Sequence, residues 1–180
     1  MAAEVKYRDI VREIAFDNFG YVTTKQAAEA GVPAVELPKL AARGGLENVA
    51  YGIYRVPDVP VSAFDQFAEA LLRAGEGSFL YGESVLAIFG LADLNPRRIR
   101  VGISRRTRPK VPPYLEFVPV KVEIETTRYE GLRSQKVADA ILVCRGRVER
   151  ARLMQAAKAA RQKGLVTSRE WVHLRKELAQ

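Results

Sequence analysis

The side chains that could do chemistry are few in this sequence, and their spacing matches no common catalytic arrangement. His173 is the single histidine and Cys144 the single cysteine, whereas a zinc site needs about four ligands. A Ser-His-acid triad would have to use His173, whose apolar neighbours favour a structural or exposed position in a C-terminal helix. Cys144 is interpreted as an ordinary small residue at a helix end.

Two short acidic patterns could take part in phosphoryl chemistry. The stretch Gly82-Glu83-Ser84 is similar in part to the glycine-serine element of nucleotidyltransferases, but no Asp-x-Asp follows it to hold a metal ion. Glu123 and Glu125 alternate on a predicted strand and could bind Mg²⁺ in a nuclease. A third class of function is therefore a nuclease subunit that uses Glu116, Glu123 or Glu125. Alternating acidic residues more often form a solvent-facing side, and no P-loop or dinucleotide fingerprint occurs. We therefore expect no enzyme, no metal and no cofactor.

Positive charge gathers in the second part of the chain. Residues 1–60 carry 7 Lys and Arg against 8 Asp and Glu, and residues 61–180 carry 22 against 13. The overall net charge of +8 favours a polyanionic or acidic partner. The basic patch consists of Arg97, Arg98, Arg100, Arg105, Arg106, Arg108, Lys110, Arg145, Arg147 and Arg150, with Arg152 beside it. It either holds DNA phosphates or meets an acidic protein, unless it is only a solvated surface.

The elements that position these groups are indicated by apolar spacing and by helix-ending residues. Apolar residues at helical spacing predict a first helix over residues 4–19, which ends at Gly20. The next three residues are too few for more than a β-bridge. Thr23 and Gln26 have the spacing of a capping box, which predicts the start of a second helix.

A third helix and a hairpin follow. The third helix is expected over residues 34–43, with Pro38 making its first turn irregular or marking the start of its regular part. Residues 46–56 alternate in polarity around Gly52, which indicates a β-hairpin. The order of helix, bridge, helix, turn, helix and hairpin predicts a winged helix-turn-helix over Lys6–Pro57.

Such a module places one helix in the major groove of DNA and its hairpin beside it. The expected DNA contacts come from three elements. They are Thr23, Thr24 and Lys25 at the start of the second helix, Glu36, Lys39 and Arg43 on the groove helix, and Asn48, Tyr51 and Arg55 on the hairpin. The near-neutral charge of this segment also allows a packed domain that contacts protein, because non-specific DNA binding depends on phosphate neutralisation.

The fold class expected is α+β, an N-terminal winged helix-turn-helix followed by a mixed α/β C-terminal domain. The prolines of Pro57–Pro60 predict a stiff linker, and hence domains over residues 1–58 and 59–180. The second domain is expected to contain helices over 62–74, 81–91, 134–143, 148–163 and 168–179 and strands over 99–104 and 115–127. Arg98 and Arg100 would share the polar face of the first strand, and Pro119 would mark the second as an edge strand.

The cell compartment is indicated by what the sequence lacks. No apolar run approaches the roughly 18 residues that span a bilayer, and the N-terminus lacks the apolar block of a signal peptide. A single cysteine excludes an internal disulfide. We expect a cytoplasmic protein without membrane contact.

Two sets of residues in this sequence have types and spacings that match a known protein family. The first is Gly20-Tyr21-Val22-Thr23-Thr24, Gly31-Val32, Leu37, Leu40, Arg43-Gly44 and Gly52-Ile53-Tyr54-Arg55, and the second is the helix from Tyr81 to Gly90-Leu91. With the strand Ile99–Ile103 and the C-terminal helices, they resemble the AbiEi-type antitoxins over most of the chain. Pro38 departs from the family, whose members usually place a polar or basic residue there.

The resemblance implies a two-part protein, and we expect it to act as a monomer or weak dimer on DNA. Its winged helix would bind double-stranded promoter DNA and repress its own operon. Its second domain would neutralise a cognate nucleotidyltransferase-like toxin. The alternative is a stand-alone transcriptional regulator whose second domain dimerises or senses a ligand, and a neighbouring toxin gene would favour the first interpretation.

Overall fold

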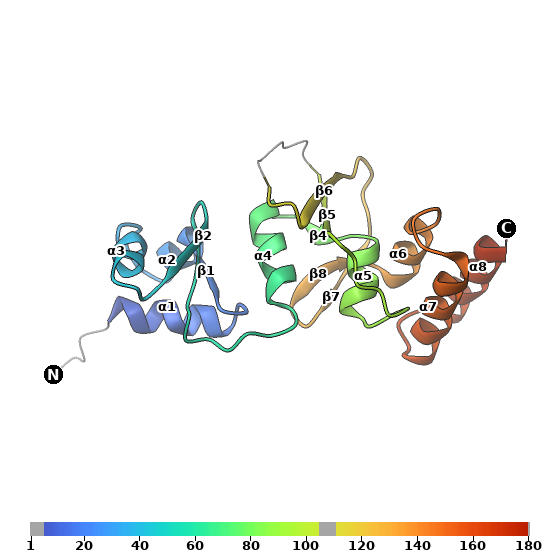
Figure 1. Cartoon of the computed structure of the whole chain (residues 1–180), viewed down its shortest axis with the longest axis horizontal. Coiled ribbons are helices and arrows are strands. Elements are labelled where there is room, and N and C mark those ends of the chain that lie inside the picture. Colours follow the sequence, from blue (N-terminus) through green and yellow to red (C-terminus); the bar gives the residue numbers. More distant parts are fainter. Residues whose placement is uncertain (1–5, 105–110, 180) are drawn as a thin grey trace. The chain divides into compact units, whose positions relative to one another are not determined.

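The computed structural model describes residues 6–104 and 111–179, and it divides the chain into two compact units after Arg73 (Figure 1). Helices and strands are mixed and form two separate sheets, so the fold class is α+β, as expected. The division differs from the sequence-based boundary after Asp58, because the helix that follows the proline linker belongs almost entirely to the first unit.

The described residues of the first unit, from residue 6 onward, form a three-stranded antiparallel sheet and four helices. Its elements are α1 (Tyr7–Phe16), β1 (Tyr21–Thr23), α2 (Thr24–Glu29), α3 (Glu36–Ala42), β2 (Glu47–Ala50), β3 (Ile53–Arg55) and α4 (Asp65–Ala74). The central strand β3 pairs with β1 on one side and with β2 on the other. The expected β-bridge at residues 21–23 is therefore a strand with a register of three residue pairs.

Local sequence explains how α2 and α3 begin. The Thr23 hydroxyl accepts a hydrogen bond from the Gln26 amide at 3.1 Å, and the Thr23 amide donates to Gln26 Oε1 at 2.9 Å, so the predicted capping box is confirmed. The helix α3 begins at Glu36, two residues later than expected. Pro38 is thus its third residue, where a missing N–H costs no intrahelical hydrogen bond.

The core of the first unit gathers apolar side chains from α1, the sheet and the segment after β3. Its buried members are Val11, Ala15, Val22, Ala27, Val32, Leu37, Leu46, Tyr54, Val56 and Val59. Three side-chain contacts attach α4 to the sheet: Arg55 to Asp65, Tyr21 to Glu69, and Arg73 to the Val49 carbonyl. These contacts explain why α4 belongs to this unit.

In the second unit, the described residues up to 104 and over 111–179 form a five-stranded mixed sheet and the remaining helices. Its elements are β4 (Phe79–Leu80), α5 (Glu83–Ile88), β5 (Ile99–Ile103), β6 (Leu115–Pro119), β7 (Thr126–Tyr129), β8 (Leu132–Gln135), α6 (Val137–Val143), α7 (Arg150–Gln162) and α8 (Ser168–Ala179). The strand order is β6-β5-β4-β8-β7, with β5–β6 and β4–β8 parallel and the other two pairs antiparallel. The helices α6, α7 and α8 pack on one another (Figure 1, orange and red).

Two sequence-based elements of the second unit are wrong. The strand expected over 115–127 ends at Pro119 as the edge strand β6, and β7 is a separate strand that begins at Thr126. The helix expected over 134–143 begins at Val137, because Ser134 and Gln135 belong to the strand β8. A two-residue turn, Glu130 and Gly131, connects β7 to β8, and both of its residues have positive φ. Such a turn is typical of a β-hairpin, so the residues after it continue as a strand and not as a helix.

Across the described residues, no helix is both long enough and apolar enough to cross a membrane.

Candidate functional site

A surface pocket of about 490 Å³, which we call the arginine pocket, lies within the second unit. Its described lining consists of Glu83, Leu94, Asn95, Pro96, Arg97, Arg98, Arg100, Glu116, Arg147, Val148 and Arg152. Five of these residues are arginines and two are glutamates, so the lining carries a formal charge of +3 at neutral pH. Four of the arginines were predicted members of the basic patch, and the fold brings them together from separate segments.

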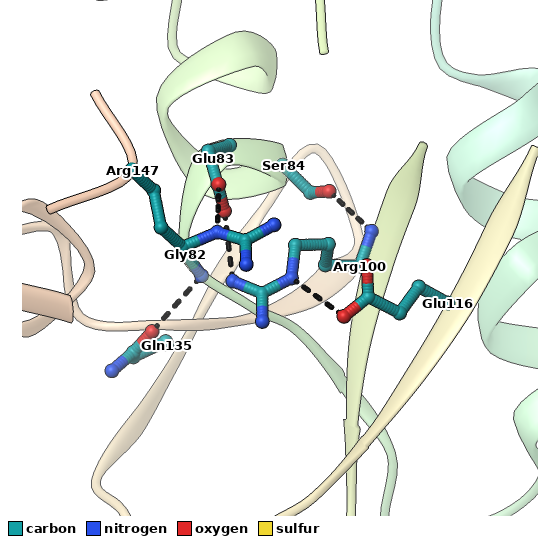
Figure 2. A network of polar contacts seen from close by, with 7 residues as sticks. All are labelled: Gly82, Glu83, Ser84, Arg100, Glu116, Gln135 and Arg147. Atoms are coloured by element: carbon teal, nitrogen blue, oxygen red, sulfur yellow. Dashed lines mark hydrogen bonds and ion pairs between the residues drawn. The ribbon is translucent and has the colours of Figure 1, made fainter. Parts of the chain in front are cut away.

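Glu83 is the centre of the polar network in this pocket (Figure 2). It is the first residue of α5 and is buried. Its Oε2 accepts a hydrogen bond from Arg100 Nη1 at 2.9 Å, and its Oε1 accepts one from Arg147 Nε at 2.6 Å. Burial alone would raise the pKa of Glu83, but hydrogen bonds from Arg147, from the backbone and from Arg100 outweigh it and lower that pKa below its usual range. The carboxylate is therefore charged at neutral pH.

Arg100 lies inside the sheet and is not part of an exposed patch, which corrects the sequence-based assignment. Its strand β5 lies between β4 and β6, and the residue is only 8 % exposed. The guanidinium also donates from Nε to Glu116 Oε1 at 3.3 Å and lies 5.4 Å from the centre of the Tyr81 ring. Its positive charge is thus held by two carboxylates of the chain itself.

Gly82 provides the backbone turn that brings Glu83 into contact with Arg100. Its φ of 54° and ψ of −122° fit the first central position of a type II′ turn, which is dominated by glycine. A Cβ at this position would lie 3.2 Å from Arg100 Nη1. The Gly82 amide donates to the buried Gln135 Oε1 at 3.2 Å, and Ser84 Oγ accepts from the Arg100 amide at 2.7 Å. The turn therefore places Glu83 directly against Arg100.

Three arginines of the pocket are exposed and carry uncompensated charge. Arg97 and Arg98 precede β5, and Arg152 lies in the first turns of α7. The side chains of the three make no hydrogen bond or ion pair within residues 6–104 and 111–179. Arg147 is half-exposed, and it uses Nε to reach Glu83. The polar ends of these side chains are available to an anion.

The other members of the basic patch lie elsewhere. Arg145 pairs with Glu177 at 2.9 Å, and Arg150 donates to the Ala179 carbonyl at 3.0 Å, so both contact the end of α8 and do not line the pocket. Four further members fall outside the described residues: Arg105, Arg106, Arg108 and Lys110.

The predicted DNA contacts at the start of α2 are partly used within the chain. The Thr23 hydroxyl belongs to the capping box, and Thr24 Oγ1 donates to the Gly52 carbonyl at 3.3 Å. Lys25 is exposed. The start of α2 therefore offers one exposed cation and two hydroxyls with internal partners.

On α3 and the β2–β3 hairpin, several candidates are exposed. Lys39 pairs with Glu36 at 2.9 Å along the solvent side of α3, and Arg43 is exposed at the end of that helix. Asn48 is exposed on β2, and Tyr51 in the hairpin turn is 103 % exposed. These two elements offer a cationic and aromatic surface.

Arg55 does not belong to that surface, contrary to the sequence-based expectation. Its side chain is mostly buried, lies 3.4 Å from Asp65 Oδ2 and donates to the Val59 carbonyl at 3.2 Å. The reason is the position of α4, whose first residue, Asp65, draws the guanidinium inward. Arg55 joins α4 to the sheet.

His173, Cys144 and the pair Glu123 and Glu125 do not gather in one site, whereas Glu83 and Glu116 both line the pocket described above. His173 is exposed on α8, whereas Cys144 is buried at the end of α6, where burial and the Glu83 charge raise the thiol pKa to about 12. Glu123 and Glu125 lie in the segment between β6 and β7 and not on a strand, which removes their predicted alternation. Among residues 6–104 and 111–179, no group of three or more His, Cys, Asp or Glu could hold a metal ion.

Sequence reasoning missed the centre of the pocket. Glu83 was considered only as part of a possible nucleotidyltransferase element, and Gln135 was assigned to a helix. Comparison of the chain with protein-family models and with curated proteins gave no match. What the geometry supports chemically is the binding of an anion by several guanidinium groups.

Proposed function

We propose that this chain is a DNA-binding repressor whose first unit is a winged helix-turn-helix, and that it is the antitoxin of an AbiEi-type toxin–antitoxin pair. The observation that carries the DNA-binding part is the order α1, β1, α2, α3, β2, β3 with the sheet order β1-β3-β2. In this arrangement α3 is the helix that enters the major groove, and the β2–β3 hairpin is the wing. A repressor acts on the chromosome, so the proposal places the chain in the cytoplasm.

The exposed groups on α3 and the hairpin support this assignment. Lys39 and Arg43 offer cationic donors for base edges or phosphates, and Tyr51 and Asn48 extend from the hairpin. Arg55 is excluded from the interface because Asp65 holds it.

The two units differ in net charge, and we therefore assign them different contributions to DNA binding. Residues 1–73 carry 8 Lys and Arg against 10 Asp and Glu, a net of −2, and residues 74–180 carry 21 against 11, a net of +10. Because phosphate neutralisation supplies most non-specific DNA affinity, the first unit contributes shape and a few contacts. The second unit contributes the electrostatic attraction.

A gel shift tests the DNA-binding part. The probe is a fluorescein-labelled duplex from directly upstream of the chain's own start codon, with a shuffled duplex of the same composition as competitor. The triple variant Lys39→Ala/Arg43→Ala/Tyr51→Ala should lose about tenfold or more in affinity, since it removes contacts worth roughly 1–3 kcal/mol each.

The matched control removes the same number of cations and tyrosines from α1. Tyr7→Ala/Arg8→Ala/Arg12→Ala removes an exposed tyrosine and two exposed cations from the same unit. This control should retain the affinity of the unmodified chain. Equal losses in the two triple variants would show that only overall charge matters and would refute the assignment of α3 and the hairpin.

The antitoxin part is tested in cells that express the product of the neighbouring gene. The unmodified chain should restore growth, and the Lys39→Ala/Arg43→Ala/Tyr51→Ala variant should restore it as well, because neutralisation is assigned to the second unit. Failure of the unmodified chain to restore growth, together with specific promoter binding, would favour a stand-alone regulator instead.

The arginine pocket is the observation that favours this second candidate. A regulator that responds to a small ligand needs a cavity of a few hundred Å³ with convergent polar groups. The pocket of about 490 Å³ in the second unit has both properties.

A further inference from the structure

We propose that the arginine pocket of the second unit binds the terminal phosphate group of a nucleotide, either free or at the 5′ end of a nucleic acid strand. This inference goes beyond the proposed function, because it concerns a site in residues 74–180 and does not depend on DNA recognition by the first unit. Its evidence is the charge of the pocket, the fixed inner wall, the open guanidinium groups and the size of the cavity.

The charge of the pocket selects for a multiply charged anion. With five arginines against two glutamates, the described lining has an excess of three positive charges. A phosphodiester carries one negative charge, whereas a terminal phosphate carries about 1.5 to 2 at neutral pH, and a diphosphate more. A terminal phosphate therefore balances more of the excess than a backbone phosphate can.

The inner wall of the pocket is fixed before any ligand arrives. Glu83 holds Arg100 through Oε2 and Arg147 through Oε1, and Glu116 holds Arg100 from the other side. In Figure 2, the guanidinium groups of Arg100 and Arg147 both reach Glu83. Arg147 contacts Glu83 through Nε, so its two Nη groups have no hydrogen-bond partner within the described parts of the chain. A pre-positioned guanidinium loses little entropy when it binds an oxyanion.

The other three arginines of the pocket have exposed guanidinium groups. Arg97, Arg98 and Arg152 are exposed and have no ion pair within residues 6–104 and 111–179. Arg152 lies in the first turn of α7, a thirteen-residue helix whose N-cap residue is Glu149. A bound anion would supply the counter-charge that the described residues do not give to these three guanidinium groups.

The size and the neutral lining of the pocket fit part of a nucleotide. Its volume of about 490 Å³ lies within the range of about 300–1,000 Å³ that small-molecule sites occupy. Leu94, Pro96 and Val148 supply apolar surface next to the arginines, and Asn95 supplies an amide. Guanidinium groups match phosphate oxygens in pairs, which gives the site its preference for the phosphoryl end.

Isothermal titration calorimetry on the full chain at about physiological ionic strength tests this proposal, with inorganic pyrophosphate, ATP, adenosine and citrate as probes. We expect binding of pyrophosphate and ATP and none of adenosine. The variant Arg97→Ala/Arg98→Ala/Arg152→Ala should weaken pyrophosphate and ATP binding about tenfold or more, because it removes charge-assisted hydrogen bonds. A thermal melt checks that this variant folds.

The control removes the same charge away from the pocket. Lys158→Ala/Arg169→Ala/Lys176→Ala takes three exposed cations from α7 and α8, none of which lines the pocket. This variant should bind pyrophosphate as the unmodified chain does. Equal weakening in both triple variants would overturn the proposal, as would citrate binding as tight as that of pyrophosphate, or no pyrophosphate binding at all.

A final comparison identifies the source of the phosphate. Short oligothymidines with and without a 5′-phosphate are titrated beside ATP. Tighter binding of the phosphorylated strand supports a strand end as the ligand, and binding of ATP alone supports a free nucleotide. Equal binding of the two oligothymidines, with no response to ATP or pyrophosphate, would overturn the proposal in favour of general attraction to the DNA backbone.

Discussion

At the residue scale, one buried carboxylate organises the second unit. Glu83 neutralises Arg100 inside the sheet and also reaches Arg147, which lies 64 positions later in the sequence. Buried ion pairs add little net stability, but the removal of one partner leaves an uncompensated charge in a poorly solvated place. The network therefore makes the fold of this unit depend strongly on a single side chain.

The first prediction concerns that dependence. Glu83→Gln should lower the free energy of unfolding by about 3–5 kcal/mol, because the 8 % exposed Arg100 loses its closest counter-charge. Urea denaturation measures the change. The control Glu123→Gln alters an exposed glutamate and should change stability by less than about 0.5 kcal/mol. Equal effects would show that Glu83 is not a structural counter-ion.

The second prediction concerns pH. Because the folded-state pKa of Glu83 is lowered, its contribution to stability is present above the unfolded-state pKa of about 4.3 and is lost as the pH falls through the folded value. The stability difference between the unmodified chain and Glu83→Gln should therefore be constant from pH 7 to about pH 5 and shrink at lower pH. Urea denaturation at several pH values measures it, and a difference that grows on acidification would contradict the prediction.

The third prediction concerns the turn before Glu83. Gly82→Ala should cost about 1–3 kcal/mol more than Gly131→Ala. Both glycines have positive φ, but a Cβ at Gly131 meets nothing within 4 Å, whereas one at Gly82 lies 3.2 Å from an arginine held by two carboxylates. Thermal unfolding compares the two variants, and equal losses would show that backbone strain alone matters.

At the element scale, the stability of a short helix depends on how the free backbone amides at its start are hydrogen-bonded. The helix α2 has six residues, too few to be stable by propensity, and its capping box satisfies amides that the first turn leaves unpaired. The helix α4 is stabilised differently, through contacts with the sheet. Burial and the neighbouring Glu69 raise the pKa of Tyr21 above its usual range, so its hydroxyl remains a donor to that carboxylate.

The fourth prediction follows from the capping box. Thr23→Ala should destabilise the chain by about 0.5–2 kcal/mol, and Thr23→Ser should keep most of the stability because serine also supplies a capping hydroxyl. Denaturant unfolding distinguishes the two. If serine were as damaging as alanine, the methyl group of Thr23 and not its hydroxyl would carry the effect.

At the scale of the whole molecule, the division after Arg73 makes α4 part of the first unit. Asp65, Glu69 and Arg73 contact the sheet, and Phe67, Ala68 and Ala70 of the same helix are buried. The linker of prolines therefore connects two parts of one unit. A fragment of the first unit that ends before α4 would lose these contacts with the sheet.

The fifth prediction tests this boundary. A fragment of residues 1–74 should unfold in one cooperative transition, because it keeps the contacts of α4 with the sheet. A fragment of residues 1–58 should melt at a lower temperature or without cooperativity, because Arg55 and Tyr21 lose their partners. Circular dichroism melts compare the two, and equal melting temperatures would place the boundary back at the linker.

Short-range signals determined much of the fold from sequence alone. Apolar spacing predicted α1, α4 and α8, the pair Thr23 and Gln26 predicted the capping box, and Gly52 predicted the hairpin, since each depends on residues within a few positions. The strand β8 was missed because the turn at Glu130 and Gly131 was not weighed, although a glycine between alternating residues is a hairpin signal.

The polar site was decided by tertiary structure. Sequence showed that arginines gather in the second part of the chain, but it assigned Arg100 and Arg147 to the same exposed patch. The sheet places Arg100 between two strands, and the fold brings Arg147 to Glu83 across 64 positions, so Arg100 becomes an internal counter-ion and Arg147 its half-exposed neighbour. Burial and pairing depend on which segments the fold brings together, and residue spacing along a chain does not carry that information.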